Sequence, residues 1–117
     1  MPSTGRRLKA GLRAFQDGDY TNAYVLLLPL AERGHPEAQC LIGNLHDGGF
    51  GRPRDQAQAV LWYERAAAQG HVVAMNNLGT IAVQQGDLAR AKHWYDKADE
   101  LGFVGISRAE RRRLGCL

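Results

Sequence analysis

The feature that most constrains the fold of this chain is an internal repeat. Three glycines, Gly34, Gly70 and Gly102, each end an apolar-periodic stretch and lie 36 and 32 residues apart. The residues at fixed distances before each glycine match between copies, and they are Asp19, Asp55 and Asp87; Ala23, Ala59 and Ala91; Leu26, Trp62 and Trp94; and Leu27, Tyr63 and Tyr95. Repeats of this length are typical of solenoids, in which each unit buries its apolar face only against its neighbours.

Each copy predicts a pair of helices. The aspartate is suited to cap the start of the second helix, the alanines and aromatic residues fall on one helical face, and the glycine fits the end. The second helices are expected at 19–33, 55–69 and 87–101, and the first helices at about 3–16, 36–47 and 72–85. Strand patterns are nearly absent. The predicted fold class is therefore all-α.

The predicted organisation is a single repeat domain over residues 1–117. Its units are repeat 1 at about 3–35, which is degenerate, repeat 2 at about 36–71, and repeat 3 at about 72–103. After Gly102, Ser107 and Glu110 have the spacing of a capping box. A short C-terminal capping helix is therefore expected at 106–115.

The motifs of the second copy resemble the Sel-one-like repeat (SLR), a relative of the tetratricopeptide repeat. They are the glycine loop at 48–51, the Trp62-Tyr63 pair and the Ala-Ala-x-x-Gly ending at 66–70. Residues 72–102 are similar with a shorter loop, whereas residues 6–34 match only in their second helix. The resemblance implies a right-handed superhelix of three antiparallel helix pairs. Such arrays serve mainly as scaffolds or adaptors that bind other proteins, with the first helix of each pair on the concave surface.

A partner groove follows from aligning the copies on Gly11, Gly43 and Gly79. The concave positions of the tetratricopeptide repeat then fall on Leu8, Leu12, Phe15, Cys40, Asn44, Asp47, Asn76, Thr80, Val83 and Gln84. Amides there could bond the backbone of an extended protein segment or peptide. The three apolar residues of the first helix could hold an apolar side chain, or they could be core if that helix rolls inward; both alternatives stay open.

Basic residues are concentrated at the two ends of the chain. The net charge is +3 and the isoelectric point near 9.1. The basic patch residues are Arg6, Arg7, Lys9, Arg13, Arg111, Arg112 and Arg113. They offer an alternative function, the binding of an acidic partner or of nucleic acid, of which nucleic acid is the less expected. A homodimer through one end face is also consistent with so short an array.

No pattern of catalytic or metal-binding residues is present in the sequence. Serine occurs only at Ser3 and Ser107, and the two cysteines, Cys40 and Cys116, have no CxxC spacing. The histidines form neither an HExxH motif nor a His-Cys ligand cluster. We therefore expect no enzyme, no catalytic residue, no metal and no cofactor.

The expected location is the cytoplasm, with no membrane partner. The longest apolar run, 24–28, has five residues, far short of a membrane span. The basic N-terminus leads into further charged residues instead of an apolar segment, unlike a secretory signal.

Overall fold

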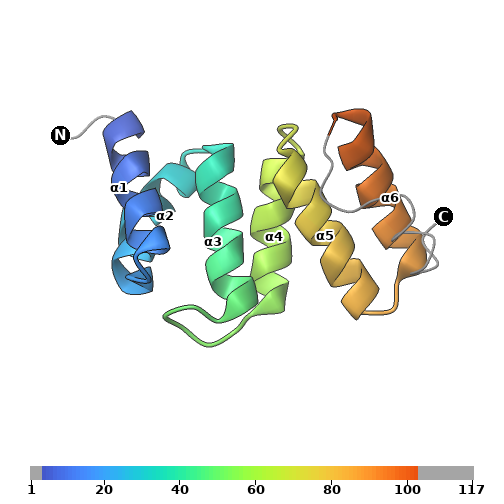
Figure 1. The fold of residues 1–117 in the computed structure, drawn as a ribbon, viewed down its shortest axis with the longest axis horizontal. Coiled ribbons are helices and arrows are strands. Elements are labelled where there is room, and N and C mark those ends of the chain that lie inside the picture. Colours follow the sequence, from blue (N-terminus) through green and yellow to red (C-terminus); the bar gives the residue numbers. More distant parts are fainter. Residues whose placement is uncertain (1–3, 103–117) are drawn as a thin grey trace.

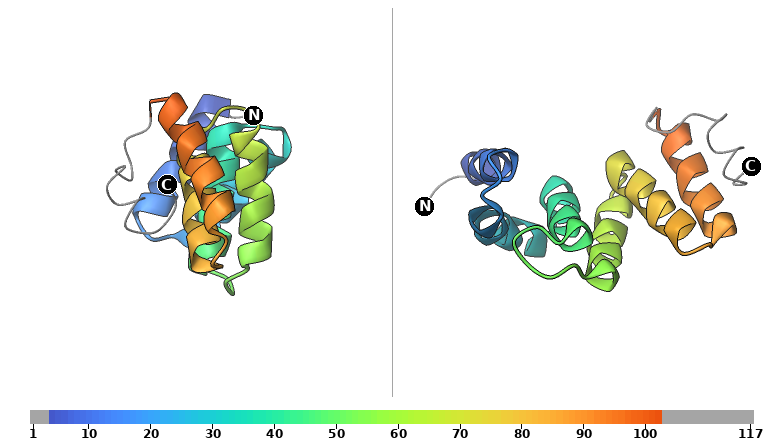
Figure 2. Two further views of the ribbon diagram at one scale, coloured as in Figure 1. Left: turned by 90° about the vertical axis from the view of Figure 1, so that its right-hand side faces the viewer. Right: turned by 60° about the horizontal axis from the view of Figure 1, so that its bottom comes forward.

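Six helices make up the structure, a computed structural model that describes residues 4–102. In chain order they are α1 (Thr4–Gln16), α2 (Tyr20–Glu32), α3 (Pro36–Gly48), α4 (Gln56–Ala67), α5 (Val72–Gln84) and α6 (Leu88–Glu100). They follow one another along the long axis of the molecule (Figure 1), and Figure 2 shows the same stack from its α6 end and from below. Within the described residues all regular elements are α-helices, so the all-α prediction and the three helix pairs are confirmed. The expected capping helix at 106–115 lies outside the described residues.

The second helix of each pair begins where the repeat predicts. The side chains of Asp19, Asp55 and Asp87 accept hydrogen bonds from the backbone N–H three residues further on, at 3.4, 3.1 and 3.1 Å. Each bond satisfies one of the N–H groups that the first turn of a helix leaves without a partner. The matching sequence positions therefore have the same structural role in all three copies.

Within each pair, a glycine in the first helix lets the second helix approach closely. A Cβ atom built on Gly43 would lie 2.6 Å from ring atoms of Tyr63, and one on Gly79 would lie 2.5 Å from the ring of Tyr95. In the first pair the partner of Gly11 is a leucine, at a similar 2.5 Å. In all three pairs, therefore, a large side chain of the second helix packs directly against a glycine of the first helix.

Between pairs, the tryptophans have matching surroundings. Trp62 is buried in a cluster that includes Ala31 of α2 and Leu41 of α3. Trp94 packs against the next cluster along the chain, which includes Ala67 of α4 and Leu78 of α5. Trp62 is therefore buried between two helix pairs, whereas Trp94, on the last helix, is partly buried.

The long loop between α3 and α4 folds back onto the first pair. The ring of Phe50 stacks on Tyr20 with centroids 4.9 Å apart, and the guanidinium of Arg52 lies 3.3 Å from the ring centroid of Tyr24. Arg54 donates from Nε to the backbone carbonyl of Asp47 at 2.8 Å. Both loop arginines thus contact the protein itself and hold the loop in place.

Candidate binding surface

The first helices α1, α3 and α5 carry the predicted groove residues, and we call the side of the molecule on which these residues lie the A-helix face. A direct hydrogen bond joins α3 to α5 across it, since Nδ2 of Asn77 donates to Oδ1 of Asn44 at 3.3 Å. The hydroxyl of Tyr63, reaching up from α4, donates to the same oxygen at 2.6 Å. The polar residues of α3 and α5 are therefore linked into one continuous surface.

On α3, the predicted groove residues differ in their accessibility. Cys40 is only 3% exposed and belongs to the core cluster shared by α4 and α5, so it is not available to a partner. Burial and the carboxylate of Glu37 raise the pKa of its thiol to about 12, which keeps it protonated. Asn44 is partly buried by its bonds to Tyr63 and Asn77, and Asp47 is partly buried with one oxygen 3.6 Å from Arg54.

On α5, the predicted residues form a stripe along the helix. Asn76 is partly buried; its Oδ1 is itself buried and accepts no hydrogen bond from the described residues, so a partner would meet the rest of this side chain. Thr80 is exposed, and its hydroxyl bonds the backbone carbonyl of Asn76 and the hydroxyl of Tyr95, both at 3.1 Å. Gln84 is exposed and accepts from Gln56 at 2.9 Å, whereas Val83 packs against a small core cluster. This stripe is the most polar and open part of the predicted groove.

On α1, the three apolar candidates pack inward. Leu8, Leu12 and Phe15 are partly buried against the core cluster of α2 and α3. The ring of Phe15 meets Tyr20 and Phe50 edge-on, with centroids 5.6 and 6.3 Å apart. These contacts favour the core alternative over a groove that holds an apolar side chain.

The predicted basic patch on α1 is divided by the fold. Arg7 turns toward α2, where its Nε donates to the carbonyl of Leu26 at 2.9 Å. Arg6, Lys9 and Arg13 are exposed on the other side of the helix. The remaining members of the patch, Arg111, Arg112 and Arg113, lie outside the described residues.

Asn77 is a residue of this surface that the sequence analysis did not select. It sits beside Asn76, one step round the helix, and bonds both Asn44 and, at 3.9 Å, the sulfur of Cys40. The alignment on Gly79 selected its neighbour because it assumed the geometry of the tetratricopeptide relative. The paired asparagines in the sequence were the available signal that two amides face this surface together.

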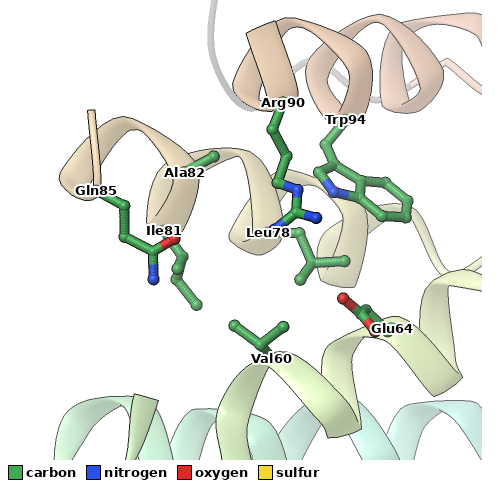
Figure 3. A pocket seen from close by; sticks show the side chains of 8 residues that line it. All are labelled: Val60, Glu64, Leu78, Ile81, Ala82, Gln85, Arg90 and Trp94. Atoms are coloured by element: carbon green, nitrogen blue, oxygen red, sulfur yellow. The ribbon is translucent and has the colours of Figure 1, made fainter. Parts of the chain in front are cut away.

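On the opposite side, α4, α5 and α6 enclose a small cleft (Figure 3). Its apolar floor comes from Val60, Leu78 and Ile81, its wall from Trp94, and Glu64 stands at its edge. It has room for roughly one water molecule. The cleft is therefore too small to take a partner's side chain without rearrangement.

Residues 4–102 contain no group of three or more His, Cys, Asp and Glu side chains arranged to hold a metal ion. The two histidines that follow helix-ending glycines start the next helices, and His71 bonds Glu37 at 3.0 Å and the backbone N–H of Ala74. Over the same residues, none of the helices has the length and apolar character to span a membrane.

Comparison with known proteins finds helical repeat proteins both by sequence and by structure. A family model described as Sel1 repeat matches residues 36–71 and 72–103. The solved structure of c5321, a protective antigen of uropathogenic Escherichia coli strains displaying an SLR fold, is 34% identical, with a TM-score of 0.77 over 86% of this chain and 23% of that one. A Sel1 repeat protein from Oxalobacter formigenes is 31% identical, with a TM-score of 0.73 over 82% of this chain and 41% of that one.

One curated relative is similar over part of the chain. A chitin synthase regulator SKT5 of Malassezia restricta is 40% identical over 62 residues, which are 53% of this chain and 4% of that protein. The chain thus spans a small fraction of this relative and less than half of each of the two solved structures.

Proposed function

The chain belongs to the Sel1 repeat family, as its motifs predicted, and we propose that it holds an extended segment of a partner protein on its A-helix face. Sel1 repeat proteins are generally protein-interaction modules. In this proposal the chain is a scaffold or adaptor that performs no chemistry itself. The expected cytoplasmic location stays a prediction.

The observation that carries the proposal is the linked polar surface of α3 and α5. Asn76, Thr80 and Gln84 follow one another at four-residue spacing, which places them on one side of α5. The hydrogen bond from Asn77 to Asn44 joins this stripe to α3. Side-chain amides both donate and accept hydrogen bonds, so they can pair with the N–H and C=O groups of an extended backbone.

The mode of recognition follows from these groups. Hydrogen bonds from side-chain amides to a peptide backbone contribute affinity but depend little on the side chains of the peptide. The predicted groove residues of α3 and α5 include no lysine or arginine that could bind a terminal carboxylate. The partner segment is therefore expected to be internal to its protein, and not a free C-terminus.

Peptides selected on the chain from a random phage-displayed library provide the test. Asn76→Ala with Gln84→Ala should weaken the binding of selected peptides by about tenfold or more in fluorescence anisotropy, because two amide pairings are lost. Thr80 is left intact because its hydroxyl bonds Tyr95. Circular dichroism should show unchanged helicity.

The matched control removes two exposed polar side chains from the second helices, Thr21→Ala with Gln58→Ala. This variant should bind the selected peptides as the unaltered chain does. Equal binding by the α5 variant, or a loss shared by the control, would contradict the assignment to the A-helix face.

A further inference from the structure

The outer face of α1, which carries Arg6, Lys9 and Arg13, corresponds to the face of α3 and α5 that packs against another helix. In the second and third pairs, the equivalent face of the first helix packs against the second helix of the preceding pair. Ala38 and Leu45 of α3 share a core cluster with α2, and Ala74 and Ile81 of α5 share one with α4. No preceding pair among the described residues covers the same face of α1.

The residues of this face are charged in α1, whereas five of their six counterparts in α3 and α5 are apolar. When the copies are aligned on their helix glycines, Arg6 corresponds to Ala38 and Ala74. Arg13 corresponds to Leu45 and Ile81. Lys9 lies between them, at the position of Leu41 in α3 and of Asn77 in α5. With spacings of three and four residues, the three cations form one stripe along α1.

The stripe is open to a partner. Arg6, Lys9 and Arg13 are all exposed, whereas Arg7 is turned away by its bond to α2. A broad hollow runs beside the stripe, lined by Lys9, Ala10, Leu12, Arg13, Gln16 and Asp17. The small side chain of Ala10, in the place of Ile42 and Leu78, leaves space at its centre.

We propose that the outer face of α1 binds an acidic helix of a partner protein, laid along α1 as α2 lies along α3. An apolar helix in this place would bury the charges of Lys9 and Arg13 without supplying carboxylates to pair with them, at a high cost in desolvation. A helix with carboxylates at the facing positions would pair with the cations and still use the shape that the repeat provides. This surface does not include the α3 and α5 residues of the proposed groove.

Two other occupants fit less well. A second copy would have to present the outer face of α6, where the repeat register sets Lys92, the counterpart of Val60, against Arg13, the counterpart of Ile81; in the chain itself Val60 and Ile81 line the same cleft. That face has Asp96 and Asp99 in the places of Glu64 and Ala67, so it offers two carboxylates and one cation, whereas the proposed acidic helix offers a carboxylate at each place. Among the described residues of this face, nucleic acid would meet the three cations and, beside them, the carboxylate of Asp17, which repels phosphate.

A probe for this site can be made from the chain's own second helix. The acidic peptide is the segment 53–71 with Val60→Glu and Ala67→Glu, which adds carboxylates to Glu64 on the face that α4 turns to α5. The basic peptide has Val60→Lys, Glu64→Lys and Ala67→Lys. Each is labelled with fluorescein and titrated with the full chain in fluorescence anisotropy.

The acidic peptide should bind at least about tenfold more tightly than the basic one, and its affinity should fall as salt is raised. Lys9→Glu with Arg13→Glu should remove that preference. The matched control, Arg33→Glu with Arg90→Glu, makes the same change in net charge at exposed sites away from α1 and should retain it. Asn76→Ala with Gln84→Ala should also retain it, which separates this site from the groove.

Four results would overturn the proposal. The two peptides could bind equally, or the Lys9→Glu, Arg13→Glu variant could bind the acidic peptide as before. A single-stranded oligonucleotide could bind more tightly than the acidic peptide and lose that binding in the same variant, which would assign the face to nucleic acid. Sedimentation could show self-association that the variant abolishes, which would assign it to a second copy.

Discussion

Replacing Gly43 by alanine tests the contact that closes each helix pair. In an isolated helix this change is favourable, because alanine has a better helix propensity than glycine by about 1 kcal/mol. In the folded chain the new Cβ would lie 2.6 Å from two ring carbons of Tyr63, a residue only 1% exposed. The tyrosine cannot move freely, because its hydroxyl is bonded to Asn44 at 2.6 Å.

The clash should outweigh the gain in propensity. Forcing an extra methyl group into a packed core costs about 1–3 kcal/mol. Displacing the ring would also weaken the hydrogen bond to Asn44, a loss of about 0.5–1.5 kcal/mol. The net expectation for Gly43→Ala is a destabilisation of about 1–3 kcal/mol, which for a domain near 100 residues lowers Tm by about 4–8 °C for each kcal/mol.

Thermal unfolding followed by circular dichroism measures this shift. Gly5→Ala is the matched control, because a Cβ atom there would meet nothing within 4 Å, and its Tm should stay the same or rise. Gly79→Ala should behave like Gly43→Ala, since the ring of Tyr95 lies equally close. A Tm for Gly43→Ala at or above that of the unaltered chain would refute the reasoning.

Three further outcomes are expected. Ala59→Glu should abolish cooperative unfolding or reduce stability by roughly 3–5 kcal/mol, because a charge would be forced into a site that is 0% exposed; a soluble helical variant with unchanged melting in circular dichroism would refute that packing. Burial, and to a lesser extent the charge of Arg52, lowers the pKa of His46 below its usual value of 6.5. As the pH falls, the unfolded chain therefore binds this proton before the folded chain does, and the free energy of unfolding should decrease below pH 6.5. Chemical denaturation at several pH values should show this decrease, and it should be less steep for His46→Gln. In a Cys116→Ser variant, the thiol of Cys40 should react with a disulfide reagent only after denaturant is added; rapid reaction of the native chain would show that the site opens.

The sequence was sufficient for the helices and their pairing because those depend on local, periodic signals. Asp55 caps α4 through a bond to an N–H three residues away, and Ala59 and Tyr63 lie one turn apart on the face that becomes buried. Capping bonds and helical spacings of this kind involve residues only a few positions apart, and the same pattern occurs in all three repeats. Glycine is unfavourable inside a helix, so Gly43 within α3 is a sequence signal that α4 packs closely there.

The binding surfaces were less accessible to the same reasoning. Asn76 and Asn77 are adjacent and chemically identical, and only the position of α3 relative to α5 makes Asn77 the residue that bonds Asn44. Cys40 was aligned with concave positions of a relative, yet the packing of α4 and α5 buries it.

By itself, the sequence determined that this protein is an array of three helix pairs and where each helix begins and ends, because hydrogen bonds within a turn and a 3.6-residue period are properties of the chain. Only the tertiary structure decided which charged side chains stay exposed. Arg6 and Arg7 are neighbours in sequence, but about 100° separates successive residues round a helix, and the carbonyl groups of α2 take one arginine and leave the other exposed. That choice depends on a helix 18 and 19 residues away, which no local pattern records.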